Sequence, residues 1–415
     1  MKKNHTLVMV VVCLLSLSVV SLFAQRVENK NQLGDEKTEN IQPIDINSKA
    51  QELGISEEHL QSILNSAANN GGGDPLPDAI QQRHFTGQAA GDWFGYSVST
   101  AGDVNGDGYS DVIVGASLND AGGSNAGRAY IYFGGANMDN TADVILTGAA
   151  ADDYFGYSVS TAGDVNGDGY SDVIVGASLN DAGGSNAGRA YIYYGGANMD
   201  NTADVILTGA AADDYFGSSV STAGDVNGDG YSDVIVGAYG NDAGGTSAGR
   251  AYIYYGGANM DNTADVILTG AAAGDWFGSS VSTAGDVNGD GYSDVIVGAP
   301  FNDAGGTSAG RAYIYFGGAN MDSTADVILT GAAAGDYFGY SVSTAGDVNG
   351  DGYSDVIVGA YGNDAGGSNA GRAYIYFGGA NMDSTADVIL TGAAAGDWFG
   401  YSVSTAGDVN GDGYS

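Results

Sequence analysis

The chain has 415 residues, of which 71 are glycine and 4 are proline, and it carries 50 acidic against 12 basic side chains. Glycine without a G-X-Y period excludes collagen, and a hydrophobic content of 43% excludes a disordered low-complexity chain. The net charge of −38 makes nucleic acid and anionic lipid surfaces poor partners, because like charges repel.

The first 24 residues have the pattern of a secretory signal peptide. Lys2 and Lys3 precede an apolar run from Leu7 to Ala24. An uncleaved anchor helix is the alternative, because the run is close to the length that spans a bilayer. Serines interrupt the run and it lies at the N-terminus, which favours export with cleavage. The single cysteine, Cys13, lies inside this segment, so the mature chain would have no disulfide.

Residues 25–78 form a second region, which we expect to contain a helical segment and a linker. Apolar residues follow helical spacing within residues 48–70. The stretch NNGGGDPLPD, Asn69–Asp78, is typical of a flexible connection. We interpret the region as a spacer or an export segment. After removal of the signal peptide we expect no membrane span, and a secreted or cell-surface location.

From residue 79 the chain is a tandem array with a period of 61 residues. The dipeptide Phe-Gly marks the period, beginning at residues 94, 155, 216, 277, 338 and 399. The first unit has four strand-like runs, Gly95–Gly102, Asp111–Ala116, Arg128–Gly134 and Asp143–Gly148. The second run is apolar throughout, as in a strand covered on both faces, and the third alternates, as in a half-buried strand. Four antiparallel strands per repeat predict an all-β fold, a β-propeller occupying residues 79–415.

The two ends of the array differ from its middle. Ala79–Gly87 aligns with Thr141–Gly148 of the first unit, which predicts an isolated fourth strand able to complete the last blade of a closed ring. Five units are complete, and a sixth stops at Ser415 inside its first turn. We therefore expect the sequence to be a C-terminally truncated fragment.

The loop after the first strand of each unit, DVNGDGYSD, has the residue types of a calcium site. Asp103, Asn105 and Asp107 alternate, so their side-chain oxygens can converge on one point. Tyr109 would contribute its main-chain carbonyl, and Asp111 closes the loop. Calcium takes about six to eight hard oxygen ligands in flexible geometry, and three carboxylates this close would otherwise repel one another.

A magnesium site and an EF-hand calcium site have different requirements. Magnesium demands a tighter octahedral geometry, and an EF-hand needs a glutamate at position twelve, where this chain has Val114. A metal-free Asp/Asn/Gly hairpin is the remaining possibility. We predict one Ca²⁺ for each complete repeat. The later copies of the loop place predicted ligands at Asp164, Asn166, Asp168, Tyr170, Asp172, Asp225, Asn227, Asp229, Tyr231, Asp233, Asp286, Asn288, Asp290, Tyr292, Asp294, Asp347, Asn349, Asp351, Tyr353, Asp355, Asp408, Asn410, Asp412 and Tyr414.

The combination of Phe-Gly, DVNGDGYSD and VIVGAP (Val295–Pro300) resembles the FG-GAP repeat, the blade of the integrin α-chain propeller, which also occurs in secreted bacterial proteins. The other units end this strand as VIVGAS or VIVGAY. The resemblance covers residues 79–415. It implies seven blades in a full protein, with calcium in the loops between strands one and two. It also implies ligand recognition at the opposite face.

The loops that the resemblance assigns to recognition are Ser117–Gly127 and Thr147–Gly156, with their later copies. The repeats differ mainly here, where aromatic residues such as Tyr239 and Trp276 appear. These aromatics suit ligand binding if they are exposed, and they suit packing between blades if they are buried. Each repeat also has one arginine, which either binds ligand or pairs with a neighbouring aspartate or aromatic ring.

Three classes of function stay open at this point. The first is a secreted adhesion or interaction propeller that binds an extracellular protein or carbohydrate. The second is the non-catalytic part of a secreted hydrolase, and the third is a purely structural array. We predict no catalytic or organic-cofactor residues, because the repeats have no histidine or glutamate to act as a general base.

Overall fold

The computed structural model describes residues 83–136, 138–409 and Tyr414. The predicted signal peptide (1–24) and the predicted helical and linker region (25–78) lie outside the described residues. The described part of the chain contains strands and no helix, and so no helix that could span a membrane. The prediction of an all-β fold is confirmed for this part.

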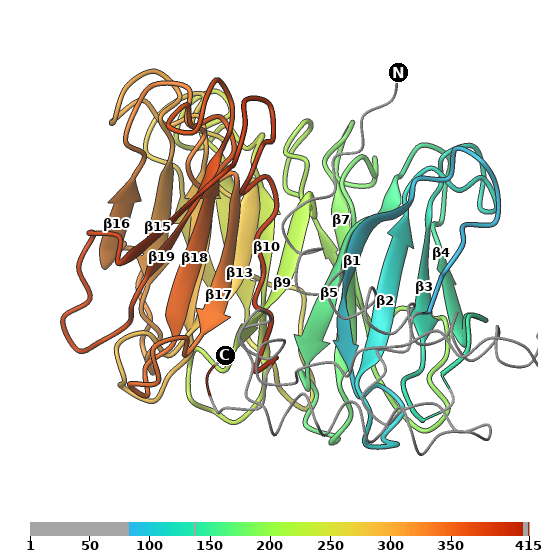
Figure 1. Ribbon diagram of the computed structural model, residues 1–415. Coiled ribbons are helices and arrows are strands. Elements are labelled where there is room, and N and C mark those ends of the chain that lie inside the picture. The colour runs from blue at the N-terminus through green and yellow to red at the C-terminus, as the bar shows by residue number, and fades with distance from the viewer. Residues whose placement is uncertain (1–82, 137, 410–413, 415) are drawn as a thin grey trace, which may run out of the picture. The chain divides into compact units, whose positions relative to one another are not determined.

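Five sheets of four antiparallel strands follow one another along the chain (Figure 1). The first contains β1 (Phe94–Gly102), β2 (Asp111–Ala116), β3 (Arg128–Tyr132) and β4 (Val144–Thr147). The second contains β5 (Phe155–Gly163), β6 (Asp172–Ala177), β7 (Arg189–Tyr193) and β8 (Val205–Thr208). The third contains β9 (Ser219–Gly224), β10 (Asp233–Ala238), β11 (Arg250–Tyr254) and β12 (Val266–Thr269). The fourth contains β13 (Ser280–Gly285), β14 (Asp294–Ala299), β15 (Arg311–Tyr315) and β16 (Val327–Thr330). The fifth contains β17 (Ser341–Gly346), β18 (Asp355–Ala360), β19 (Arg372–Tyr376) and β20 (Val388–Thr391).

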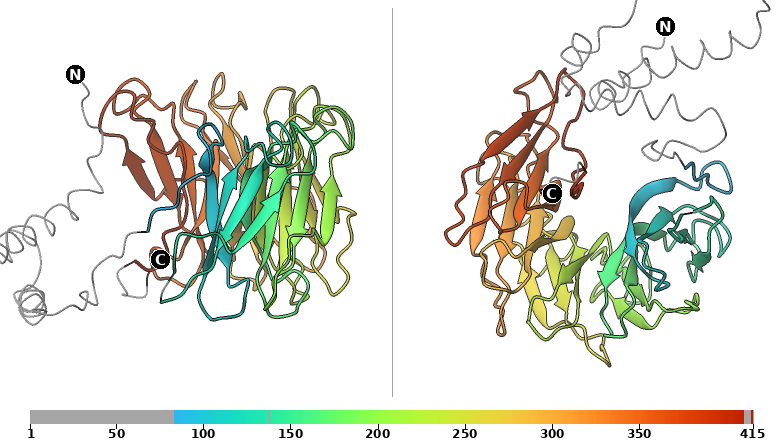
Figure 2. Two further views of the ribbon diagram at one scale, coloured as in Figure 1. Left: turned by 90° about the vertical axis from the view of Figure 1, so that its right-hand side faces the viewer. Right: turned by 60° about the horizontal axis from the view of Figure 1, so that its bottom comes forward.

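Each sheet is one repeat, and its strands pair in chain order. The first strands of consecutive sheets contact one another, β1 with β5, β5 with β9, β9 with β13 and β13 with β17. The sheets therefore lie side by side with their first strands innermost, as Figure 2 shows. The fourth strand is outermost and alternates between buried and exposed residues in β8, β12 and β16. This arrangement is that of propeller blades.

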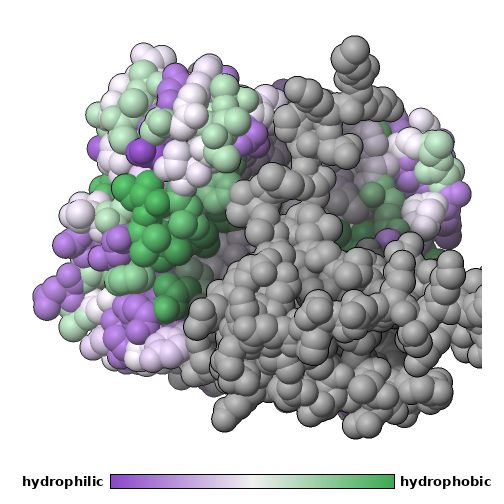
Figure 3. Space-filling view, viewed as in Figure 1, coloured by the Kyte–Doolittle hydropathy of each residue, from purple (hydrophilic) through white to green (hydrophobic). Residues whose placement is uncertain are grey.

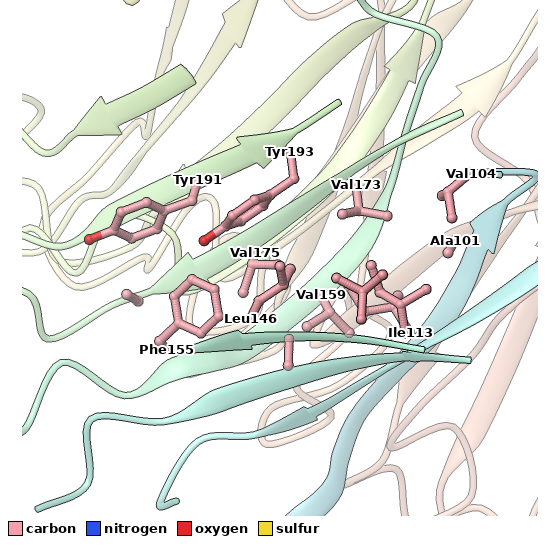
Figure 4. Close-up of a cluster of buried hydrophobic side chains, with 14 residues drawn as sticks. Ala101, Val104, Ile113, Leu146, Phe155, Val159, Val173, Val175, Tyr191 and Tyr193 are labelled. Carbon is pink, nitrogen blue, oxygen red and sulfur yellow. The ribbon is translucent and has the colours of Figure 1, made fainter. Parts of the chain in front are cut away.

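Hydrophobic clusters between consecutive sheets form the core. The cluster in Figure 4 joins Ile113 and Leu146 of the first sheet to Phe155, Val159 and other residues of the second. Three further clusters repeat this arrangement along the array. Each of the three middle sheets thus buries its two faces against two different neighbours, which explains why DVIVGA is buried throughout in β6, β10 and β14.

Two expectations for the strands need correction. The third strand was expected to be half-buried, but the last four residues of RAYIY are buried in β3, β7, β11 and β15. Neighbouring sheets cover β7, β11 and β15 on both sides, and Phe85 covers the outer face of β3. Residues 83–87, from the predicted isolated fourth strand, form no strand, since no neighbouring strand pairs with them. Phe85 nevertheless packs on the first sheet, with its ring centroid 4.2 Å from that of Tyr132.

The face of the last sheet that corresponds to the buried faces of the others is exposed among the described residues. Leu146 and its copies in the next three repeats are fully buried, whereas Leu390 is 40% exposed. Figure 3 shows hydrophobic surface on this side of the array between more hydrophilic loops. Residues 400–409 add no strand to the array.

A glycine in each repeat brings one sheet close to the next. Gly249 has φ +84° and forms an isolated parallel bridge with Phe277. A methyl group at Gly249 would lie 2.0 Å from the carbonyl oxygen of Phe277. Gly274 has nearly the same φ, +83°, but open space around it. The two glycines therefore separate the effect of close approach from the effect of backbone conformation.

We expect Gly249→Ala to lower the free energy of unfolding by more than about 1 kcal/mol, because strain and steric overlap act together. Gly274→Ala is the matched control and should cost less, since only the left-handed backbone opposes it. Asp152 and Asp213 already occupy the equivalent position with φ of 62° and 61°. Urea denaturation of the two variants measures the difference. Equal losses would contradict the role assigned to the close contact.

Candidate functional site

The two ends of each sheet carry different chemistry. Because four antiparallel strands alternate in direction, the loops after strands one and three lie at one end, and those after strands two and four lie at the other. The first end carries the repeated acidic loops. The only arginine of each repeat begins the third strand and pairs with the last residue of the second, as Arg128 pairs with Ala116. It therefore lies at the opposite end from the acidic loop, and its charge does not balance the carboxylates.

The first aspartate of each acidic loop organises the turn. In the first loop, Oδ1 of Asp103 accepts hydrogen bonds from the main-chain nitrogens of Gly106 (2.7 Å) and Asp107 (3.1 Å). Its Oδ2 accepts from the nitrogen of Gly108 at 2.8 Å. The next four loops repeat these contacts. The carboxylate therefore lies against the loop that it helps to fold.

The second and third predicted ligands are fixed by the same kind of contact. Oδ1 of Asn105 accepts from the nitrogen of Asp107 at 2.8 Å, and Oδ1 of Asp107 accepts from the nitrogen of Tyr109 at 2.9 Å. Nδ2 of Asn105 donates to Oδ2 of Asp107 at 3.2 Å. The structure thus brings Asp103, Asn105 and Asp107 together, as the sequence predicts.

The last aspartate of the loop is buried at the start of the second strand. In the first loop, Asp111 accepts from the nitrogens of Val104 (2.9 Å) and Gly134 (2.7 Å). In the second loop, burial raises the pKa of the Asp172 carboxyl to about 7. The two main-chain hydrogen bonds that this carboxyl accepts lower its pKa and so oppose the change. The carboxylates of Asp168 and Asp164 raise it further. Burial likewise raises the pKa of Asp233 and of Asp294 to about 7.

The oxygen atoms of the acidic loop are of the kind that a hard cation binds, but the carboxylate of one predicted ligand, Asp111, is engaged elsewhere. Carboxylate, amide and carbonyl oxygens are the ligands that calcium prefers, and an oxygen that accepts one hydrogen bond keeps a second lone pair. A cation would also offset the repulsion that raises the pKa of Asp172. Within the described residues, however, no three acidic or histidine side chains form a group that could hold a metal. The carboxylate of Asp111 faces main-chain amides instead, and the predicted ligands Asn410 and Asp412 lie outside the described residues.

Consecutive acidic loops are linked to each other, which sequence reasoning missed. The nitrogen of Ser171 donates to the carbonyl of Asp103 at 3.0 Å, and Ser171 Oγ accepts from the nitrogen of Asp103 at 3.2 Å. The ring of Tyr170 lies against Gly106, where Cε1 would be 2.5 Å from an added methyl group. Later repeats continue this pattern with Tyr231, Tyr292, Tyr353 and Tyr414. The loops therefore form a connected row along the array.

The loops predicted for recognition are partly structural at the opposite end. Asn180 Nδ2 donates to Oδ2 of Asp153 at 2.9 Å, and both side chains are buried. Burial raises the pKa of Asp153, and the hydrogen bond from Asn180 opposes that change. Equivalent pairs occur in the other repeats at 2.7–3.0 Å. Only the tips of these loops are thus free to meet a ligand.

Seven aromatic rings form a continuous band over the third to fifth sheets at this end. Each ring contacts the next with centroids 4.6–6.0 Å apart. The aromatic band consists of Tyr215, Tyr239, Trp276, Phe301, Tyr337, Tyr361 and Trp398. Trp276 and Trp398 are 38% and 52% exposed, and the other five are partly buried. The rings therefore pack on one another between repeats and also present apolar surface to the solvent.

Four residues of the aromatic band have a backbone conformation that is rare for bulky residues. Tyr215, Trp276, Tyr337 and Trp398 have φ between 53° and 55°. This left-handed conformation costs an L-residue roughly 1–2 kcal/mol. Strain of this kind concentrates at functional sites. The same position in the first two repeats, Trp93 and Tyr154, is also left-handed.

The arginine of each repeat makes a structural contact. Arg128 Nε donates to Oγ1 of Thr147 on the neighbouring strand at 3.2 Å. The distance is 3.2 Å in all five copies, which involve Arg128, Arg189, Arg250, Arg311 and Arg372. This geometry favours a structural role for the arginines, in which each one bonds a threonine of the neighbouring strand in its own sheet.

Comparison with known protein families matches the repeats that the structure forms. The FG-GAP repeat family matches residues 94–132, 155–193, 216–254, 277–315 and 338–376. Each match begins at Phe-Gly and ends with the third strand of a sheet. It thus spans the acidic loop and the first three strands.

Integrin α chains are among the similar proteins. Integrin alpha-5 of Xenopus laevis is 35% identical over 227 residues, which cover 51% of this chain and 20% of the integrin. Integrin alpha-PS2 of Drosophila melanogaster is 36% identical over 231 residues, 51% of this chain and 16% of the integrin. Integrin alpha-8 of Gallus gallus is 33% identical over 239 residues, 54% of this chain and 21% of the integrin. The chain spans about a fifth of the length of these relatives. The chain is therefore an FG-GAP repeat protein, and its array of blades is similar to that of integrin α chains.

Proposed function

We propose that the chain is an exported adhesion or interaction protein that binds an extracellular protein or carbohydrate. The aromatic band carries this proposal, because it combines partly exposed rings with a strained backbone at one end of the blades. Tyrosine and tryptophan are enriched in binding surfaces, where they supply a large contact area at low entropic cost. The similarity to integrin α chains supports the same class of function.

We further propose that each complete acidic loop binds one calcium ion. Asp103, Asn105 and Asp107 would supply side-chain oxygens, Tyr109 its carbonyl oxygen, and Asp111 the carboxylate that closes the site. The ion would neutralise carboxylates that otherwise repel one another and would hold the first two strands of the blade together. Asp111 would need to turn one oxygen away from its main-chain donors, and the ion would replace those contacts.

The signal-peptide pattern and the distribution of cysteine support export. The N-terminal 24 residues carry the signal-peptide pattern, and no cysteine follows Cys13. Exported domains commonly rely on disulfides, and calcium in the loops would take that role here. We place the protein outside the cell or at its surface for these reasons.

We assign no catalytic role to the array. His84 is the last histidine of the sequence and no glutamate follows Glu58, so the repeats lack the usual general bases. The aspartates of the repeats that make several hydrogen bonds lie in the acidic loops or in the buried Asn–Asp pairs such as Asn180 with Asp153. Binding, rather than bond cleavage, is the chemistry that the blades support.

Replacing one ring of the aromatic band tests the proposed binding surface. We expect Trp276→Gly to weaken retention on a bound extracellular matrix fraction about tenfold, the effect of losing an aromatic anchor. Glycine relieves the left-handed strain, so the variant should keep its fold. Tyr109→Ala, an exposed aromatic at the opposite end, is the matched control and should bind as the parent does. If Trp276→Gly folds and retains full binding, the band is not the binding surface.

A further inference from the structure

Every acidic loop places a chemically labile pair, asparagine followed by glycine, at its tip. The pairs in the described residues begin at Asn105, Asn166, Asn227, Asn288 and Asn349. Glycine leaves its own main-chain nitrogen unhindered, so that nitrogen can attack the side-chain amide of the preceding asparagine. The reaction needs no reagent other than water. Asn–Gly is therefore a recognisable site of spontaneous modification.

The glycine of the pair is required by the fold. Gly106 has φ +76°, a conformation that L side chains rarely adopt. A methyl group there would overlap the ring of Tyr170 from the next repeat. The array therefore cannot remove the liability by replacing the glycine.

Hydrogen bonds hold the attacking nitrogen and both polar atoms of the amide that it would attack. The attacking nitrogen of Gly106 donates to Oδ1 of Asp103 at 2.7 Å. Oδ1 of Asn105 accepts from the nitrogen of Asp107, and Nδ2 of Asn105 donates to Oδ2 of Asp107. The closed loop thus engages both the nucleophilic nitrogen and the amide in hydrogen bonds to other groups.

The tyrosine of the following loop adds a second restraint. The ring of Tyr170 fills the space beside Gly106, and Tyr170 is partly buried as a result. Tyr109 of the first loop covers no preceding acidic loop within the described residues and is 51% exposed. Each covered loop must therefore push aside a neighbouring ring before its main chain can rearrange.

We propose that the five Asn–Gly pairs are latent deamidation sites, kept unreactive by the closed loop and by the tyrosine of the next loop, and converted when the loop opens. In the first loop, the Gly106 nitrogen bonds to Cγ of Asn105, the Cγ–Nδ2 bond breaks, and the displaced proton leaves with ammonia. Water then adds to one carbonyl of the cyclic imide. The ring opens to aspartate or to isoaspartate, whose main chain runs through the former side chain.

Conversion would mark a loop permanently as having opened. Aspartate at position 105 loses the amide donor to Asp107 and places a like charge beside it, while isoaspartate lengthens the turn. The inference concerns the same loops as the proposed calcium sites. It depends, however, on contacts that the chain makes without an ion, so it can succeed or fail independently of calcium binding.

A tryptic map of the full chain tests the proposal site by site. One arginine per repeat cuts the array at Arg83, Arg128, Arg189, Arg250, Arg311 and Arg372, so each of the five pairs falls in its own peptide. After incubation at mildly alkaline pH without calcium, mass spectrometry reads the replacement of NH₂ by OH in each peptide. We expect all five sites to react several-fold more slowly in buffer than in denaturing urea. Equal rates in buffer and urea would overturn the proposal.

Removing one covering ring tests the restraint on a single loop. We expect Tyr170→Ser to speed deamidation of Asn105 roughly fivefold or more, the effect of making loop opening easier by about 1 kcal/mol. Asn227, Asn288 and Asn349 should react at the parental rate in the same molecules. Tyr109→Ser is the matched control, since it removes a tyrosine that covers no other described loop, and it should leave the deamidation rate of Asn105 in its own loop unchanged. If Asn105 reacts no faster in Tyr170→Ser than in the parent, the covering role of the ring is refuted.

Discussion

Removal of calcium is expected to lower the melting temperature of the array by about 10 °C or more. At a free calcium concentration 100 times the dissociation constant, each filled site adds roughly 2.7 kcal/mol to the free energy of unfolding. The five proposed sites would lie in neighbouring blades that unfold with their interfaces, so their effects would combine. Thermal melting followed by circular dichroism, with calcium and with a chelator, measures the shift.

The cause of that shift can be isolated by substitution and by ion exchange. Magnesium at the same concentration should protect less, because it demands near-ideal octahedral geometry. Asp290→Ala removes a predicted ligand from the fourth loop and should reduce the calcium-dependent part of the shift. Asp322→Ala is its control, since within the described residues Asp322 accepts one hydrogen bond, from the nitrogen of Thr324 in the loop between strands three and four. Coincident melting curves with calcium and chelator would contradict calcium stabilisation.

Truncation of a phenylalanine between two blades is expected to have the largest effect of any single core substitution. Phe277 is 1% exposed and its ring packs edge-on against Tyr313 and Tyr315. Phe277→Ala should lower the free energy of unfolding by about 3–5 kcal/mol, because it loses the transfer free energy of the ring and leaves a cavity. Denaturation in urea, followed by tyrosine fluorescence, measures the loss.

The equivalent phenylalanine of the last repeat provides the matched control. Phe399 occupies the same place in the repeat but is 40% exposed, because no further sheet covers it among the described residues. Phe399→Ala should therefore cost less than about 1 kcal/mol. Similar losses in the two variants would mean that burial between blades does not set the stability of the array.

Much of the fold could be predicted from the repeat because its period and its strand patterns are nearly invariant. The run DVIVGA predicted a doubly covered strand, and β6, β10 and β14 confirm it. The third strand was predicted less well. The alternation in RAYIY indicates two different faces, but one repeat does not reveal that a neighbouring sheet covers each of them.

The site was predicted at the level of residue type, and its contacts between repeats were not. Alternating oxygens at Asp103, Asn105 and Asp107 follow from the spacing, and the structure brings them together. The burial of Asp111 follows from its position at the start of a central strand, but its hydrogen bonds from Val104 and Gly134 could not be predicted from the loop. Contacts such as Tyr170 on Gly106 join separate repeats, so no local pattern could reveal them.

Calcium binding by the acidic loops is tested most directly by counting bound ions. Equilibrium dialysis of the full chain against buffered calcium, followed by elemental analysis, gives the number of ions per chain. We predict at least five, one for each complete loop from Asp103–Asp111 to Asp347–Asp355, all released by chelator. A calcium content equal to that of the dialysis buffer would contradict the proposal that these loops are metal sites.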